Sequence, residues 1–523
     1  MNGHAALERQ KTLISALASR LAEQAPEFAM FETHISCILV AGEYAYKFKK
    51  AVRFDFLDFS TLELRHFYCQ EELRLNARLA PDLYLNVVPI TLRDGQPLID
   101  GPGTPVEYAV KMRAFAQEAL WSYRLQTGLL TGEEVDLLAD KLAHFHHDAA
   151  VAPVASPWCT AEALQTIADE TLNLIVVSVQ DAQDKALAEQ LQQWETLQRA
   201  TLAGIFAERK SLGMIRECHG DLHGGNILTT DGQVEAFDCI EFNDSLRWID
   251  VINDIAFVCM DLRFRRHPHL AARFLNRYLE ASGDYGGLFV LRYYEVHRAL
   301  IRCKIALLRA AQPGVDAAEV LACRQQARDY LALAIERIVP ARPAIMITHG
   351  FSGCGKSTLA RQVVEAFGVI QLRSDVERKR MHGMSATTRG ATGLYQPDVT
   401  QHTYEHLVDL ARQVVQSGVP VLVDATFLQS GQRRCFQDLA AELNVPFLIL
   451  DIQAYEATMK ARIAARERRA NDASDAGLAV LAQQIASHEI LSAEEMRQTI
   501  AVNAELTVDP IAMAKIGRLL LAS

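Results

Sequence analysis

Two short segments that both carry phosphate-handling signatures constrain this chain more than any other feature. The first reads HGDLHGGNIL and runs from His219 to Leu228, and the second reads GFSGCGKST and runs from Gly350 to Thr358. They lie far apart in a chain of 523 residues, which is too long for one hydrophobic core. We therefore expect separate compact domains and two ATP sites in one chain.

The composition indicates a globular protein. Half of the residues are apolar and 22% are charged. No apolar run is long enough to span a bilayer, and the first thirty residues lack the pattern of a secretory signal. The ten cysteines are scattered without zinc-site spacing, which suits reduced thiols. We therefore expect a cytoplasmic protein with no membrane partner and no structural metal.

The charge balance argues against nucleic acid as a partner. The net charge is −11, and such a surface repels a polyanion unless a local basic patch is present. Ligands of the size of ATP need only a local pocket. The sequence does not indicate the oligomeric state.

A lysine-bearing hairpin is predicted near the N-terminus. Apolar strands over residues 35–40 and 44–48 flank a turn that contains Gly42. Lys47 lies inside the second strand, where it must either extend to solvent or find an anion. Lys47 and Lys49 share one face of that strand, so either can be the inward lysine.

A helix predicted over residues 61–80 carries two acids that can orient this lysine. These acids are Glu71 and Glu72. We favour Glu72 as the partner.

The first signature has the residues and spacing of a phosphotransfer loop. It lies between short apolar strands, and Asp221 precedes Asn226 by five residues. In kinase catalytic loops of this spacing, the aspartate accepts the proton of the attacking hydroxyl and the asparagine holds Mg²⁺. Asp238 follows twelve residues after Asn226 at the end of an apolar strand, where a second metal carboxylate belongs.

With His219, these residues resemble the aminoglycoside phosphotransferase and choline kinase group, which is related to the protein kinases. The resemblance implies an α+β protein-kinase-like bilobal domain in which Asp221 is the catalytic base. It also implies that Asn226 and Asp238 bind Mg²⁺ and that Lys47 faces the α- and β-phosphates of ATP.

The resemblance extends to the stretch VEYAVKMRAF, which would form the strand and hinge between the lobes, with backbone near Met112 contacting adenine. The sequence departs from the wider family after Asp238, because Glu241 follows three residues later instead of two. It also lacks a glycine-rich phosphate loop in the N-lobe.

Asp250 and Asp254 lie one turn apart on a predicted helix. One interpretation is a capped helix with one exposed and one hydrogen-bonded acid. The other is support for the catalytic loop, which the family resemblance favours.

A proline-containing segment, VPARPA, separates the two halves of the chain. We predict a first domain over residues 1–338, with an N-lobe over about 28–115 and a C-lobe over about 116–338. A linker at 339–343 and a second domain at 344–523 follow.

The second signature satisfies the pattern GxxxxGK[ST] between an apolar strand at 345–347 and a helix at 359–367. This strand–loop–helix context is that of a true P-loop, in which backbone N–H groups and the lysine hold phosphates and Ser357 ligates Mg²⁺. The predicted nucleotide contacts are Gly350, Gly353, Cys354, Gly355, Lys356, Ser357 and Thr358.

Two carboxylates complete this second predicted site. Asp424 ends the strand VPVLVDATF and is a Walker B-like ligand of the magnesium shell, while Ala425 stands where many motor ATPases have a glutamate. Asp375 follows the presumed second strand, at the phosphate end of an open α/β sheet. Its rival interpretation is an N-cap for a helix that starts at Val376.

This half resembles gluconate kinases, chloramphenicol phosphotransferases, zeta-type toxins and polynucleotide kinases. The resemblance implies an α/β P-loop fold with a parallel sheet, of the small-molecule kinase type, with Asp375 as base. Arg462 and Arg466 share a helix face and form either a lid over the γ-phosphate or a solvated basic face.

The two halves together resemble bacterial fusions of an aminoglycoside phosphotransferase-like domain with a P-loop kinase-like domain. We expect a bifunctional phosphotransferase that uses ATP and Mg²⁺ on hydroxyl groups of small molecules. One alternative is a P-loop ATPase or nucleotide-sensing module fused to a regulatory pseudo-kinase scaffold. The other is an end-processing kinase acting on nucleic acid.

Overall fold

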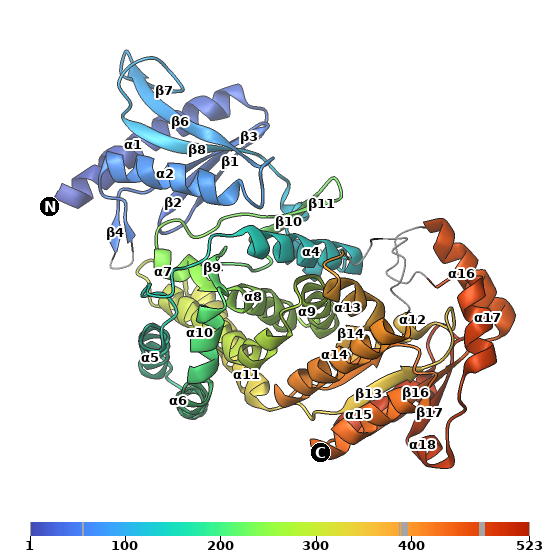
Figure 1. Ribbon diagram of the computed structural model, residues 1–523. Coiled ribbons are helices and arrows are strands. Elements are labelled where there is room, and N and C mark those ends of the chain that lie inside the picture. The colour runs from blue at the N-terminus through green and yellow to red at the C-terminus, as the bar shows by residue number, and fades with distance from the viewer. Residues whose placement is uncertain (1, 55–56, 386–387, 389–395, 470–475, 522–523) are drawn as a thin grey trace. The chain divides into compact units, whose positions relative to one another are not determined.

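The computed structural model describes residues 2–54, 57–385, 388, 396–469 and 476–521 (Figure 1). The chain divides into two compact units. Unit 1 comprises Met1–Gln180 and Glu195–Asp261, and unit 2 comprises Asp181–Trp194 and Leu262–Ser523. The division at residues 261/262 does not coincide with the predicted boundary at 339–343, because the helices at 262–338 share a compact unit with the P-loop sequence.

Unit 1 begins with a six-stranded antiparallel sheet in the order β1-β2-β3-β8-β6-β7. The predicted hairpin is confirmed, since β2 and β3 pair antiparallel around Gly42, whose φ is 59°. The elements of this region are α1 (Asn2–Gln24), β1 (Phe28–Glu32), β2 (Ser36–Ala41), β3 (Tyr44–Lys49), β4 (Arg53–Phe54), β5 (Leu57–Asp58), α2 (Leu62–Asn76), β6 (Tyr84–Arg93), β7 (Gln96–Ile99) and β8 (Glu107–Arg113).

Each face of this sheet is covered by a helix. Leu17 of α1 packs with Leu39 and Phe48 on one face. On the other face, Cys69 of α2 packs with Ala45 of β3. Because alternate residues of a strand point to opposite faces, Ala45, Lys47 and Lys49 all lie on the α2 face. The register therefore directs both lysines toward α2.

The rest of unit 1 holds the first signature between short strands, as predicted. A β10–β11 hairpin closes through Asp231 and Gly232, whose φ values of 52° and 76° suit a two-residue turn. These elements are η1 (Gln117–Ala119), α3 (Trp121–Gln126), α4 (Gly132–Asp148), α5 (Ala161–Ser178), β9 (Ile215–Glu217), β10 (Ile227–Thr230), β11 (Gln233–Ala236), α7 (Asp244–Arg247) and β12 (Trp248–Asp250). Two longer helices, α6 (Ala182–Ser211) and α8 (Val251–Phe264), have residues in both units.

Unit 2 contains the expected parallel sheet, in the order β14-β15-β13-β16-β17. The central strands β13 and β15 are buried almost throughout, whereas burial alternates along the edge strands β14 and β17. The elements are β13 (Ile345–His349), α12 (Lys356–Phe367), β14 (Ile370–Arg373), α13 (Ser374–Met381), α14 (Pro397–Gln416), β15 (Val421–Asp424), α15 (Ser430–Glu442), β16 (Phe447–Gln453), α16 (Glu456–Arg469), α17 (Leu478–Ser487), α18 (Ala493–Arg497), β17 (Thr499–Asn503) and α19 (Pro510–Leu521).

Four helical elements that precede this sheet in sequence belong to the same unit. They are α9 (Pro268–Ser282), η2 (Tyr285–Gly287), α10 (Leu288–Ala310) and α11 (Ala317–Ile338). Helix α9 packs against α12, and η2 packs against α14 (Figure 1). Within the described residues, no helix has the length and apolar character needed to cross a membrane.

We predict that Asp250→Ala destabilises the protein by about 3–5 kcal/mol. Asp250 is fully buried, and its two carboxylate oxygens accept hydrogen bonds of 2.6 and 2.8 Å from the Arg209 guanidinium. Truncating the acid leaves the buried Arg209 charge without this partner. Urea unfolding measures the change, with Glu208→Ala in the neighbouring helical turn as control. A loss below about 1 kcal/mol would contradict the prediction.

Candidate functional site

The first candidate site is organised by a buried lysine and glutamate. The Lys47 Nζ atom donates to Glu72 Oε1 at 2.7 Å, and Glu72 is fully buried on α2. Glu71 instead lies at the more exposed side of α2, where it pairs with Arg74 at 2.8 Å. The structure thus brings together Lys47 and the glutamate that we favoured from the sequence.

A second lysine shares the same glutamate. Lys49 Nζ donates to Glu72 Oε2 at 2.7 Å and also pairs with the buried Glu241. Lys47 in turn pairs with Asp238. The charges therefore alternate along a chain that runs Asp238, Lys47, Glu72, Lys49, Glu241, which we call the ion ladder. The sequence predicted that both lysines lie on one face of the strand, but it did not indicate that both form buried ion pairs.

The ion ladder shifts the pKa values of its members strongly. Burial alone would lower the pKa of Lys47, but the carboxylates of Asp238 and Glu72 outweigh it and hold this pKa well above its usual value. Burial alone would raise the pKa of Glu72, but Lys47 and Lys49 lower it to about 2. Burial raises the pKa of Glu241 despite its contact with Lys49.

The loop that contains Asp221 places its acid beside Asn226. The Asn226 amide donates to Asp221 Oδ2 at 3.0 Å and to the Asp221 backbone carbonyl at 3.1 Å. The Asp221 side chain is one-third exposed, so a ligand can reach it. His219 is buried, and burial lowers its pKa, which leaves a neutral ring. That ring accepts from the Asp221 N–H at 3.2 Å and pairs with the Phe237 carbonyl at 2.9 Å.

Two acids of α8 hold the loop from its buried side. Asp254 accepts the backbone N–H groups of His219 and Gly220, each at 2.8 Å. Asp261 accepts the N–H of Gly224 at 2.8 Å. The geometry of Asp254 agrees with loop support.

The expectation for Asp250 was wrong in its placement. Asp250 ends β12 instead of lying inside a helix, and it caps α8 by accepting the Ile252 N–H at 2.9 Å. It is also fully buried, so neither of the two acids is exposed. The helix-like spacing of Asp250 and Asp254 did not indicate that a strand ends at residue 250 and a helix begins at residue 251.

Asp238 lies near the end of β11 in a left-handed conformation with φ of 62°. Its N–H donates to the Tyr84 hydroxyl at 3.2 Å, and its side chain is 43% exposed. Asp221, Asn226 and Asp238 are oxygen-bearing side chains of the kind that Mg²⁺ prefers. Glu241 is held by Lys49 and is buried away from solvent.

Met112 lies on β8 with its side chain in an apolar cluster that includes Ala45 and Leu228. This buried side chain is therefore part of the apolar core that packs against the sheet. The predicted contact of its backbone with adenine stays a prediction.

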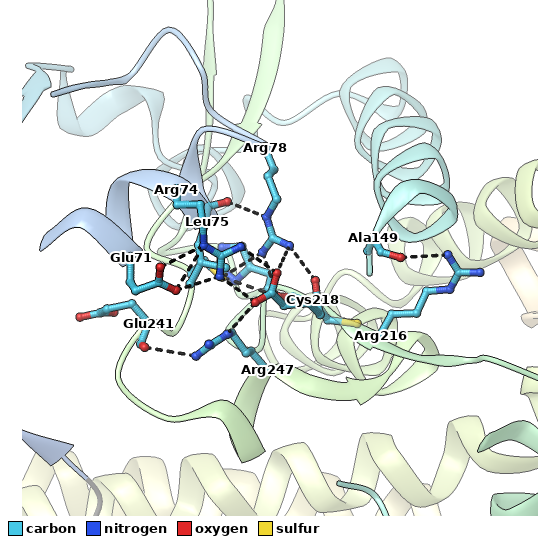
Figure 2. A network of polar contacts seen from close by, with 12 residues as sticks. Glu71, Arg74, Leu75, Arg78, Ala149, Arg216, Cys218, Glu241 and Arg247 are labelled. Carbon is cyan, nitrogen blue, oxygen red and sulfur yellow. Dashed lines mark hydrogen bonds and ion pairs between the residues drawn. The ribbon is translucent and has the colours of Figure 1, made fainter. Parts of the chain in front are cut away.

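A network of arginines around Glu217 ties the end of α2 to the start of the loop that contains Asp221. Glu217 ends β9, two residues before His219. Figure 2 shows Arg74 of α2, Arg78 just after this helix, and Arg247 converging on this region. Arg74 Nη2 donates to Glu217 Oε1 at 2.8 Å. Arg78 Nη1 donates to the Glu217 carbonyl at 2.9 Å. The helix that carries Glu72 is therefore anchored to the strand that carries the loop.

The second candidate site is the P-loop between β13 and α12. Gly350 and Gly353 have φ of 146° and 81°, which favour glycine. A Cβ on Gly353 would lie 2.7 Å from the Met459 carbonyl oxygen, so the packing also requires glycine there. Lys356 folds over the loop and donates to the carbonyls of Gly350 and Phe351 at 3.1 and 2.9 Å.

Asp424 lies at the end of β15, beside the P-loop. Burial raises its pKa, against the lowering effects of Arg373, Lys356 and a hydrogen bond from Ser357. Gln371 Nε2 donates to Asp424 Oδ2 at 2.9 Å. The two predicted magnesium ligands of this site, Ser357 and Asp424, therefore lie together.

A cavity of about 590 Å³ connects these groups. The predicted residues on its wall are Gly353, Gly355, Lys356, Ser357, Thr358, Asp375, Asp424, Arg462 and Arg466. Its wall also includes Arg378 and four residues that sequence reasoning missed, which are Arg373, Thr400, Tyr404 and Gln432. Thr400 and Tyr404 lie on α14, while Arg373 and Gln432 come from β14 and α15, so no single local pattern in the sequence joins them.

The N-cap interpretation of Asp375 is wrong. Helix α13 begins at Ser374, so Asp375 lies in its first turn, and the capping position is Arg373. The Asp375 carboxylate accepts from Arg378 Nη1 at 3.1 Å. Arg462 donates to the carbonyls of Cys354 and Ala504 at 2.9 and 2.7 Å.

A third group of side chains has the composition of a metal site. The ligand atoms of His146, Cys218 and Asp254 lie within 4.8 Å of one another. Asp254 already accepts two backbone N–H groups, and burial raises the pKa of the Cys218 thiol well above its usual value. The Cys218 thiol also contacts the Ile249 carbonyl at 3.5 Å and His146 pairs with Asp254 at 3.3 Å, so we interpret this group as a hydrogen-bonded part of the loop support.

Family models match both halves of the chain. One described as "Phosphotransferase enzyme family" matches residues 68–292. One described as "AAA domain" matches residues 345–491. The first match includes the loop at residues 219–228 and the second includes the P-loop sequence. The chain therefore carries a phosphotransferase-like domain followed by a P-loop kinase-like domain, as its motifs predicted.

Relatives and similar structures cover the same two halves. The uncharacterized protein Rv2004c of Mycobacterium tuberculosis is 30% identical over 86% of this chain and 89% of its own length. The uncharacterized protein Mb2027c of Mycobacterium bovis matches to the same extent. A choline/ethanolamine kinase family protein from Mesorhizobium loti covers 62% of this chain and 99% of its own, with 12% identity and a TM-score of 0.38. A gluconokinase from Sinorhizobium meliloti covers 35% and 95%, with 19% identity and a TM-score of 0.26.

We predict that the stabilising effect of Glu72 is lost in acid. Because the folded-state pKa of about 2 lies below the usual value of 4.5, this contribution is present above pH 4.5 and disappears as the pH falls toward 2. The difference in unfolding free energy between the wild type and Glu72→Gln should therefore shrink over this range. Chemical unfolding at a series of pH values measures it, with Glu71→Gln as control. A difference that stays constant down to pH 2 would contradict the shifted pKa.

Proposed function

The chain belongs to one family with the mycobacterial protein Rv2004c, and we propose that it is a bifunctional ATP-dependent phosphotransferase. Each of its two sites would transfer the γ-phosphate of ATP to a hydroxyl group of a small molecule. In unit 1, Lys47 pairs with Asp238 and Asn226 with Asp221, and the Phe237 N–H joins the two pairs through the Asn226 carbonyl. This arrangement, together with the P-loop that unit 2 separately contains, is the observation that carries the proposal. A cytoplasmic location stays a prediction.

At the first site, Asp221 would act as the base. The acceptor hydroxyl oxygen forms a bond to the γ-phosphorus, and its proton passes to the Asp221 carboxylate. The bond from the γ-phosphorus to the bridging oxygen breaks, and ADP leaves with that electron pair. Asn226 supports this role because its amide orients Asp221 Oδ2. Lys47 would face the α- and β-phosphates, while Glu72 holds its ammonium group in place.

At the second site, the P-loop backbone and Lys356 would hold the β- and γ-phosphates. Asp375 lies on the wall of the same cavity and would receive the proton of the acceptor hydroxyl. Arg462 and Arg466 line the cavity from α16 and would stabilise the γ-phosphate. The same bonds form and break as at the first site.

Both sites have residues that fit Mg²⁺, which would neutralise phosphate charge when bound. Asn226 and Asp238 would hold it at the first site, and Ser357 and Asp424 at the second. The fit rests on oxygen donors that lie together, such as the Ser357 hydroxyl and the buried Asp424 carboxylate.

One observation favours a second candidate function for unit 2. The Arg378 guanidinium already contacts the Asp375 carboxylate. An acid held in this way suits a nucleotide-sensing module or ATPase better than a proton acceptor. In that case the first half would be either an independent kinase or a regulatory pseudo-kinase scaffold.

We predict that Asp221→Ala and Lys356→Ala each remove a different phosphorylated product. The base variant should lower turnover at the first site by about 10²–10⁴-fold, since general bases contribute rate factors of this size. The measurement is ATP consumption with a panel of hydroxylated metabolites, followed by mass spectrometry of the products. Lys460→Ala, on the exposed side of α16, is the control for loss of a lysine.

The pattern of losses separates the candidate functions. If Lys356→Ala abolishes all turnover and Asp221→Ala has no effect, the first half is a scaffold. If Lys356→Ala changes ATP binding but no product, unit 2 is a sensing module.

A further inference from the structure

A side chain of helix α9 forms hydrogen bonds with the backbone at one edge of the parallel sheet in unit 2. Strand β14 is the edge strand, and edge strands leave backbone groups unpaired. The Asn276 amide donates to the Val369 carbonyl at 3.0 Å and accepts the Gln371 N–H at 2.7 Å. A carboxamide carries a donor and an acceptor side by side, so it pairs with the edge as a neighbouring strand would. Asn276 therefore fixes β14 at Gln371.

The contact continues from Gln371 to the P-loop site. Gln371 Nε2 donates to Asp424 Oδ2 at 2.9 Å. Asp424 is buried and lies beside Ser357 on the cavity wall. The position of its carboxylate thus depends on Gln371, whose backbone is held by Asn276.

A second contact fixes the helix that carries Asp375. On α13, Glu377 is 1% exposed. The Tyr285 hydroxyl of η2 donates to Glu377 Oε1 at 3.1 Å, and Arg380 Nε donates to Glu377 Oε2 at 3.0 Å. His406 of α14 also contacts this carboxylate, at 3.6 Å. These contacts hold the buried side of α13 in place. Asp375, on the same helix, faces the cavity.

The C-terminal end of α9 also contacts Arg373 and Arg380. The Glu280 carboxylate accepts from Arg373 at 3.3 Å, and the Glu280 carbonyl accepts from Arg380. Gly283 ends α9 with φ of 76°, and a Cβ there would lie 2.6 Å from Arg380 Nη1. The left-handed backbone at this C-cap position favours glycine.

We infer that the α9–η2 segment is a working part of the P-loop site, in which Asn276 positions Asp424 and Tyr285 positions α13. The segment lies within residues 68–292, which match the phosphotransferase family model, yet it serves the site of the other matched half. The inference rests on the proposed phosphotransfer at the P-loop site.

The test uses the full chain with Asp221→Ala, so that remaining product comes from the P-loop site. With Asn276→Ala added, we expect the Mg²⁺ concentration for half-maximal turnover to rise about three- to tenfold, the effect of one lost hydrogen bond. With Tyr285→Phe added, we expect kcat to fall by about the same factor while the Mg²⁺ dependence stays unchanged. A merely structural role would lower the thermal stability and leave both kinetic quantities unchanged.

The control is Tyr330→Phe, which removes another buried tyrosine hydroxyl from unit 2. It should leave the kcat and the Mg²⁺ dependence at their starting values. If Asn276→Ala and Tyr285→Phe behave like this control, the inference is wrong.

Failure of the proposed function gives a different result. In that case Lys356→Ala leaves product formation unchanged in the Asp221→Ala background. The inference is then tested by calorimetric titration with ATP in the presence and in the absence of Mg²⁺. Binding at the P-loop site is identified as the binding event that Lys356→Ala abolishes. A smaller Mg²⁺-dependent gain in affinity in Asn276→Ala supports the positioning role, and an unchanged gain overturns it.

Discussion

The need to pair buried charge is the constraint on which both candidate sites depend. A carboxylate removed from water costs several kcal/mol unless oppositely charged or hydrogen-bonding groups surround it. Glu72 meets this need with two lysines, and Glu377 meets it with Tyr285 and Arg380. Both lysines come from β3 while Glu72 lies on α2, and Tyr285 comes from η2 while Glu377 lies on α13. Satisfying the charge therefore fixes a helix, α2 in one unit and α13 in the other, beside the residues that would handle phosphate.

In the ion ladder, each buried charge of the first site has a partner of opposite sign. Because Lys49 holds one oxygen of Glu72 and Lys47 holds the other, the glutamate would keep a partner if Lys47 turned toward the ATP of the proposed reaction. Glu241, whose spacing departs from the family pattern, is the counter-charge of Lys49.

The compact units and the sequence families divide the chain differently, and the packing of α9 explains why. The first family model extends to residue 292, while unit 2 begins again at Leu262. Between these positions, Asn276 occupies the open edge of β14. An exposed sheet edge favours unwanted pairing with other chains, so covering it with a preceding helix joins that helix to the sheet. Residues of one family half then belong to the compact core of the other.

Local patterns in the sequence determined the β2–β3 hairpin, the loop between short strands and the P-loop between β13 and α12, because backbone conformation and hydrophobic periodicity are properties of neighbouring residues. They did not determine where α13 begins, or that Asp250 ends a strand. The sequence favoured Glu72 as the partner of Lys47, but the pairing of Lys49 with both Glu72 and Glu241 was decided by the tertiary structure alone. Lys47 and Glu72 are 25 residues apart, and Lys49 and Glu241 are 192 apart. Such pairs form because folding removes both groups from water at the same place, which no spacing in the sequence encodes.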